Sequence, residues 1–227
     1  MSTPDGAFNA LAPGRTGPLP FVQVAISGVA MLAVGVALGA GLGWLSWRFW
    51  VLGLGGLVLG LGVGWSLAVL TTWLGGPRRR WLVTALATVA VLAGWAVHQT
   101  FEDAHQRQAY RVALAETRAA ETGLPPAEVQ RLLAAGGLDY LADDGDAVLE
   151  KQVAADIGFG GVAGRWLFRA QGGVRLAGSW RAGRALPVGI PGVIVAALLE
   201  LAVAVLIASR IVRRSRSNDT SQAQPLS

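Results

Sequence analysis

One acidic residue, Glu200, lies inside an otherwise apolar stretch and is the first candidate for a functional side chain. The residues from Val188 to Ala208 include no other ionisable group. On insertion scales a charged residue at the centre of a bilayer costs about 2.5 to 3.5 kcal/mol, so such residues face the protein interior and find partners. Two hypotheses follow: a neutral carboxyl that holds helices together, or a proton or cation relay or contact with a partner subunit. The available partners are neutral, either backbone groups or the side chains of Trp65, Ser66, Thr71, Thr72, Thr84 and Thr88.

A second candidate site combines the only two histidines of the chain with a carboxylate. His98, Glu102 and His105 are spaced at i, i+4 and i+7, which places them on one face of a helix. Histidine and carboxylate are ligands for zinc and other divalent ions. Because no cysteine or further histidine completes the set, the competing interpretation is a solvated helix face at the membrane interface.

Other motifs that carry chemistry are missing. The aspartates at 139, 143, 144 and 146 do not follow the EF-hand spacing, so a capped loop is expected there. The chain has no Walker loop, no H-E-x-x-H motif and no cysteine. We therefore expect no cofactor and favour a protein that is not an enzyme.

The composition is typical of a membrane protein. Hydrophobic residues make up 53% of the 227 residues and charged residues only 15%, whereas ordinary soluble domains are about 25% charged. A helix that spans a bilayer needs about 20 mostly apolar residues. Four segments approach or exceed this length, at about 21–45, 50–74, 81–97 and 187–209.

These segments predict an all-α membrane protein with four transmembrane helices and a mainly helical extracytoplasmic domain at 98–186, between helices 3 and 4. The third helix is expected to continue without a break to residue 122. Further helices are predicted at 126–135 and 147–157, the latter with Asp146 as N-cap. The tails at 1–20 and 210–227 are expected to be disordered, the second after a basic start.

The predicted external domain divides by charge. Residues 101–157 carry 11 acidic and 5 basic side chains, and residues 158–186 carry 5 basic and no acidic ones. The basic part is glycine-rich and predicts either a β-hairpin that turns at Gly172 and Gly173 or a segment lying on the membrane. We expect this part to lean on the bilayer, on the acidic part or on a second copy.

Glycines recur every four residues in the first two predicted spans. Residues four apart share one helix face, and small residues there let two backbones approach closely. Tight packing within the bundle, a glycine zipper, is the favoured interpretation, with oligomerisation or a narrow pore as alternatives. A four-residue link predicts that the two helices form an antiparallel hairpin. The glycines are Gly35, Gly39 and Gly43 in the first span and Gly56, Gly60 and Gly64 in the second.

Arginines beside the spans predict the orientation. Two groups lie in short segments after the second and fourth spans, so both are on one side of a four-span protein, and the positive-inside rule makes that side cytoplasmic. Both termini are then cytoplasmic, in the plasma (inner) membrane of a bacterium. The pI of about 10.9 thus reports topology and contact with anionic lipid headgroups rather than nucleic acid. The groups are Arg78, Arg79 and Arg80, and Arg210, Arg213, Arg214 and Arg216.

Three functions are compatible with these features. The favoured one is a scaffold, assembly or sensing component whose external domain contacts a protein partner or a second copy of the chain. The alternative is a small proton- or ion-conducting protein that uses Glu200. A metal site at His98, Glu102 and His105 is the third and weakest.

Overall fold

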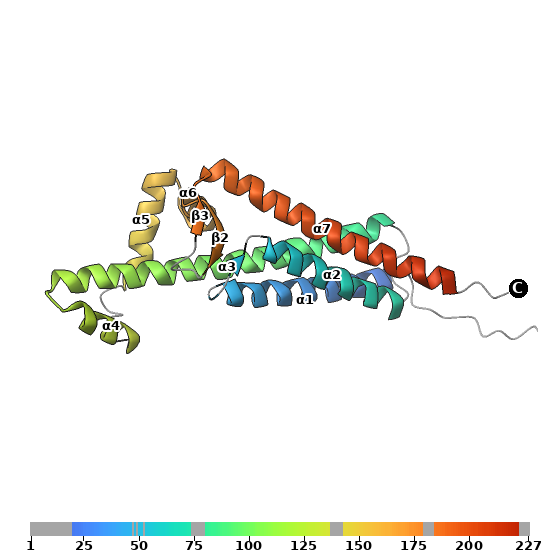
Figure 1. Ribbon diagram of the computed structural model, residues 1–227, viewed down its shortest axis with the longest axis horizontal. Coiled ribbons are helices and arrows are strands. Elements are labelled where there is room, and N and C mark those ends of the chain that lie inside the picture. Colours follow the sequence, from blue (N-terminus) through green and yellow to red (C-terminus); the bar gives the residue numbers. More distant parts are fainter. Residues whose placement is uncertain are drawn as a thin grey trace, which may run out of the picture.

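The computed structural model describes residues 20–46, 48, 50–51, 53–73, 80–136, 143–178 and 184–222. This part of the chain forms seven helices and three short strands (Figure 1). Their order is α1 (Pro20–Ser46), β1 (Trp50–Val51), α2 (Leu54–Trp73), α3 (Arg80–Glu121), α4 (Pro126–Ala134), α5 (Gly145–Ile157), α6 (Gly161–Gln171), β2 (Val174–Gly178), β3 (Arg184–Leu186) and α7 (Gly189–Gln222).

Four of the helices, α1, α2, α3 and α7, are long and apolar enough to cross a membrane. Their large apolar side chains face outward as well as inward: Trp65, for example, is 70% exposed. A helix that is apolar on all sides suits a lipid environment, where the outer face meets hydrocarbon rather than water. The predicted multi-pass membrane architecture is confirmed at this level.

The four long helices pack as two parallel pairs, α1 with α3 and α2 with α7. Each of Gly56, Gly60 and Gly64 meets the residue that lies 144 positions later, so both helices of that pair advance in the same direction. Helices α1 and α2 also contact each other, through Leu38 and Gly62. The buried core between the pairs consists mainly of Met31, Leu42, Leu59, Val63, Leu67, Ala87, Val91, Ala204, Ala208 and Val212.

Helix α3 joins the bundle to the rest of the molecule. It is one uninterrupted helix of 42 residues, about 63 Å long at 1.5 Å per residue, as the sequence predicts. Its first half lies in the bundle, and its second half projects beyond it with α4 on one side and α5 on the other (Figure 1). Ala115, Ala119 and Val129 form the small core between α3 and α4.

The basic part folds back onto this junction. Helix α6 packs against α3, α5 and α7, and strands β2 and β3 form an antiparallel hairpin. Strand β1 pairs with the side of β2 that faces away from β3, with Trp50 opposite Gly178 and Val51 opposite Ala177. The small sheet therefore joins the link between α1 and α2 to the segment that precedes α7.

Several predicted boundaries are wrong. The second long helix begins at Leu54 rather than residue 50, because Trp50 and Val51 pair with β2. The predicted hairpin that turns at Gly172 and Gly173 is wrong, because these glycines follow α6; the observed hairpin lies further along the chain, between β2 and β3. Helix α7 continues to Gln222, through the predicted tail. Residues 1–19 and 223–227 of the predicted tails lie outside the described residues.

The predicted N-cap of α5 is also displaced. The helix begins at Gly145, and the cap position is Asp144, whose side chain makes no capping hydrogen bond. That carboxylate binds Arg118 instead, and Asp146 in the first turn binds Arg111. The other end follows the expected pattern, since Gly158 adopts φ 93° and its N–H donates to the Ala154 carbonyl.

Candidate functional site

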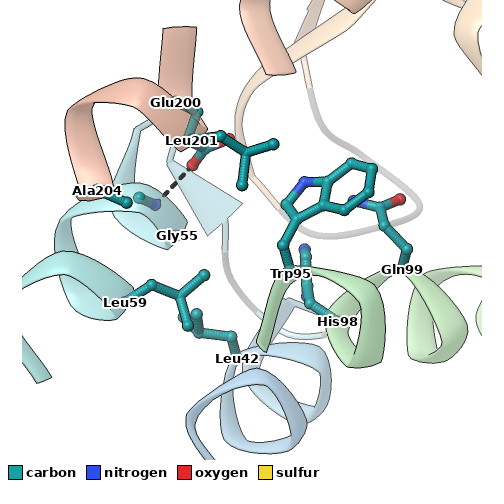
Figure 2. Close-up of a pocket in the computed structure, with 10 residues that line it drawn as sticks. Leu42, Gly55, Leu59, Trp95, His98, Gln99, Glu200, Leu201 and Ala204 are labelled. Atoms are coloured by element: carbon teal, nitrogen blue, oxygen red, sulfur yellow. Dashed lines mark hydrogen bonds between the residues drawn. The ribbon is translucent and has the colours of Figure 1, made fainter. Parts of the chain in front are cut away.

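Glu200 binds the end of a neighbouring helix. Its Oε1 atom accepts a hydrogen bond of 2.8 Å from the backbone N–H of Gly56, in the first turn of α2 (Figure 2). The first amides of a helix have no partner within the helix, and its N-terminus carries partial positive charge. The carboxylate therefore satisfies an amide of α2 from another helix, as an N-cap residue does within one helix.

Glu200 lies near one end of the bundle, although it is central in its apolar stretch of sequence. It is near the middle of the apolar part of α7, yet it lies beside the first turn of α2 rather than halfway along it. Eleven residues of α7, from Gly189, precede it. Glu200 thus lies at the end of the bundle from which the second half of α3 projects.

A cavity of about 50 Å³ adjoins the Glu200 carboxyl. Helix α3 contributes Trp95, His98 and Gln99 to one wall, and Glu200 lies on the opposite wall (Figure 2). Leu42 and Leu59 line its apolar side. The cavity therefore places one carboxyl, one imidazole and one amide around a shared space.

A buried ion-pair cluster lies one turn further along α3. Asp103 forms a bidentate pair with Arg165 of α6, with N···O distances of 2.6 and 3.0 Å, and both side chains are about 90% buried (10% and 11% exposed). Arg165 also pairs with Glu150 of α5. Bidentate arginine and carboxylate pairs fix geometry as well as charge, so this contact holds α6 and α5 against α3.

Arg169, one turn along α6, extends the cluster towards the cavity. It donates to the Gln99 side-chain oxygen and lies 3.8 Å from Glu102. The other oxygen of Glu102 lies 2.5 Å from the hydroxyl of Ser46, the last residue of α1. The cluster thus connects the end of α1, the middle of α3 and the short helices α5 and α6.

The three predicted metal ligands do not form a closed ligand set. His98 lines the cavity, and Glu102 is engaged with Ser46 and Arg169. His105 lies one turn beyond Glu102 and is partly exposed. Over the described part of the chain, no three His, Asp or Glu side chains are arranged to hold a metal ion.

The acidic turn before α5 is engaged with arginines of α3. Asp144 accepts hydrogen bonds from Arg118 at 2.6 and 3.0 Å, and this contact lowers the pKa of the Asp144 carboxyl below its ordinary value of 3.8. Asp146 binds Arg111 in the same way, at 3.1 and 2.5 Å. Asp139 lies outside the described residues. The aspartates that the structure describes with partners therefore hold α5 to α3.

The glycine stripes lie where helix backbones approach most closely. A Cβ atom added at Gly35 or Gly39 would lie 2.1 Å from the carbonyl oxygen of Ala90 or Gly94 in α3. At Gly43 it would lie 2.5 Å from Phe101. In the other stripe, added Cβ atoms would lie 2.6 to 2.8 Å from α7, opposite Glu200, Ala204 and Ala208 for Gly56, Gly60 and Gly64 respectively. The first stripe therefore faces α3 and the second faces α7, and neither stripe faces the other.

Of the arginines that predict the orientation, those that the structure describes lie near the C-terminus of α7 and at the N-terminus of α3. Helices α2 and α7 run parallel, so their C-terminal ends lie at one end of the bundle. Arg210, Arg213 and Arg214 lie on the last part of α7 and are exposed. Arg80 begins α3, the side chain of Arg216 is not described, and Arg78 and Arg79 lie outside the described residues.

Sequence reasoning did not select Asp103, Arg165 or Arg169. Asp103 and Arg165 are 62 residues apart, and Gln99 and Arg169 are 70 apart, so no local spacing marks them. The one signal in the sequence that these parts pair is the opposite net charge of residues 101–157 and 158–186.

In comparisons with known protein families, curated proteins and solved structures, nothing matches the chain. The function must therefore be argued from the two sites themselves.

Proposed function

We propose that the chain is a non-enzymatic assembly or sensing component of a bacterial plasma membrane, which acts through the unit formed by α4, α5, α6 and the second half of α3. The observation that carries this proposal is the buried Asp103 and Arg165 pair, which joins that unit to the bundle. A second connection is α3 itself, which is continuous through both parts.

Two connections between the parts suit a sensor or scaffold better than a tethered binding module. A single flexible link would let the unit move independently of the bundle. Here α3 is one rigid helix that runs through both parts, and the contacts of Arg165 and Arg169 hold α6 against it. A partner bound to α4 or α5 would therefore change how the long helices pack.

The proposed orientation places both termini in the cytoplasm and this unit on the opposite, extracytoplasmic side. Exposed arginines near the end of α7 support it, since the positive-inside rule assigns that end to the cytoplasm. The same arginines suit anionic lipid headgroups. The protein partner is a second copy of the chain or another membrane protein.

Photo-crosslinking in intact membranes tests this proposal. A photoreactive residue replaces Gln152 or Ala155, both exposed on α5, and Leu198, exposed on α7, provides the matched control position. We expect the α5 positions to give one reproducible protein adduct, which Arg165→Gln weakens while the chain stays in the membrane. If purified chain is monomeric and no position on α4 or α5 yields a reproducible adduct, the proposal is wrong.

Proton or ion conduction through Glu200 is the second candidate, and the cavity beside the carboxyl favours it. Conduction also needs a polar path on the far side of Glu200, where the described core contains Val63, Leu67 and Val91 and the buried polar side chains are those of Ser27 and Ser209. Flux measured in reconstituted vesicles tests it: a conducting wild type and a silent Glu200→Gln variant would support conduction. Equal flux in both proteins, or none in either, would exclude it.

A further inference from the structure

We propose that Glu200 is a proton-binding site that exchanges protons only with the solution on the side of the unit formed by α4, α5, α6 and the second half of α3, called the α3–α6 unit below. The cavity next to Glu200 is its access route. This inference concerns the long helices and their access to water, so it does not depend on whether α4 or α5 binds a partner.

Polar groups continue from Glu200 towards that unit. His98 and Gln99 line the same cavity as Glu200, and Gln99 accepts a hydrogen bond from Arg169. Arg169 belongs to α6, where Arg165 reaches Glu150, whose side chain is 37% exposed. A water molecule or a protonated imidazole in this series can carry a proton between the solution and the cavity.

In the opposite direction the described buried side chains are apolar, apart from the hydroxyls of Ser27 and Ser209. Val63, Leu67 and Val91 fill the bundle beyond the cavity, and each is 0% exposed. A proton on Glu200 therefore has a polar exit on one side and a packed core on the other.

The charged groups around Glu200 are few. Helix α2 contains no ionisable residue, and α1 contains none either. Helix α3 contributes His98 at the cavity and Glu102 one turn away, and α6 contributes Arg169 through Gln99. Among the described side chains His98 is thus the ionisable group that shares the cavity with Glu200.

The exchange itself is a simple proton transfer. Uptake converts the Glu200 carboxylate into the neutral acid, with the proton supplied by hydronium or a buffer acid on the side of the α3–α6 unit. Release returns the proton to the same side. The acid weakens the attraction between Glu200 and the N-terminus of α2, because the helix end favours negative charge.

Labelling with dicyclohexylcarbodiimide tests the proposal, since this apolar reagent modifies protonated carboxyl groups in apolar surroundings. The full chain is reconstituted in sealed vesicles, its orientation is read from protease accessibility, and the pH is set separately on each side. Mass spectrometry of the peptide that contains Glu200 measures the modification. We expect labelling to fall by up to about tenfold per pH unit as the solution on the α3–α6 side becomes alkaline.

Two variants sharpen the experiment. Glu200→Gln abolishes modification of that peptide. His98→Gln removes the imidazole from the cavity wall, so labelling of Glu200 should respond more slowly than in wild type to a change of pH on the α3–α6 side. Labelling that follows the pH of the opposite side overturns the proposal. So does a wild-type Glu200 that is unreactive in vesicles at every pH but reactive after denaturation in detergent at acid pH.

Discussion

The Glu200 carboxylate caps the first turn of α2 through the Gly56 N–H, although 144 residues separate the two in the chain. The same contact is one of the closest approaches between α2 and α7, since a Cβ added at Gly56 would lie 2.6 Å from Glu200 Cγ. A single residue pair thus combines helix capping, small-residue packing and an ionisable group. This combination decides where the bundle tolerates change.

Replacing Glu200 by alanine should destabilise the bundle by about 1 kcal/mol, the usual effect of removing an N-cap acceptor. Glu200→Gln should retain more of that stability, because the side-chain amide oxygen still accepts from Gly56. The measurement is unfolding of the purified protein in mixed micelles by increasing SDS, followed by circular dichroism. If alanine and glutamine are equally harmful, the hydrogen bond is not the stabilising element.

Gly39 and Gly41 provide a matched pair in α1. Gly39→Ala forces a Cβ against the Gly94 carbonyl and should cost about 1 to 3 kcal/mol, as overpacking does. Gly41 is exposed with nothing within 4 Å of an added Cβ, so Gly41→Ala should be neutral or stabilise the helix by up to about 1 kcal/mol. Equal unfolding midpoints for the two variants would contradict the close approach of α1 and α3.

Arg165→Gln should release α6 from α3. The substitution leaves the buried Asp103 carboxylate without its bidentate partner, and breaking a buried pair in this way costs about 3 to 5 kcal/mol. We expect faster hydrogen exchange in α6 while α1 and α2 stay protected. Asp103→Asn added to Arg165→Gln should recover part of the loss.

Arg111 serves as the control for Arg165. Its side chain is 50% exposed and pairs with Asp146, and exposed pairs contribute at most about 1 kcal/mol. Arg111→Gln should therefore change exchange only near the start of α5. An effect of Arg111→Gln on α6 as large as that of Arg165→Gln would argue against the buried cluster as the principal link.

The attachment of α5 to α3 should weaken in acid. The pKa of Asp144 is below 3.8 in the folded protein because of its contact with Arg118. This contact therefore stabilises the fold above about pH 3.8, and that contribution is lost as the pH falls through the lower folded value. Hydrogen exchange at the start of α5 should differ between wild type and Asp144→Asn at pH 7 and converge below that folded pKa. A difference that persists in fully acidic solution would contradict this assignment.

Local patterns in the sequence predict the long helices well. Apolar runs of sufficient length mark α1 and α3, and the bounds of α1 differ from the prediction by one residue at each end. The exceptions arise where a distant segment competes for a residue. Trp50 leaves the predicted second helix to pair with Gly178, and Asp144 gives its carboxylate to Arg118 rather than to its own helix.

The candidate site was predictable only in part. Glu200 stands out because it is ionisable among apolar residues, and a backbone partner was among the alternatives. Its location at a helix end was not accessible, because periodicity places a residue along its own helix and not relative to α2. The Arg165 and Asp103 pair depends on chain reversal through α5 and α6, which no short spacing encodes.

The parallel pairing of α2 with α7 has a consequence for biosynthesis. Gly56, Gly60 and Gly64 are synthesised 144 residues before the positions that they contact, Glu200, Ala204 and Ala208. Until α7 emerges from the ribosome, the glycine stripe of α2 has no helix to pack against, and the amide of Gly56 lacks the Glu200 carboxylate as its acceptor. The bundle can close only after the entire segment that contains α4, α5 and α6 has been translated.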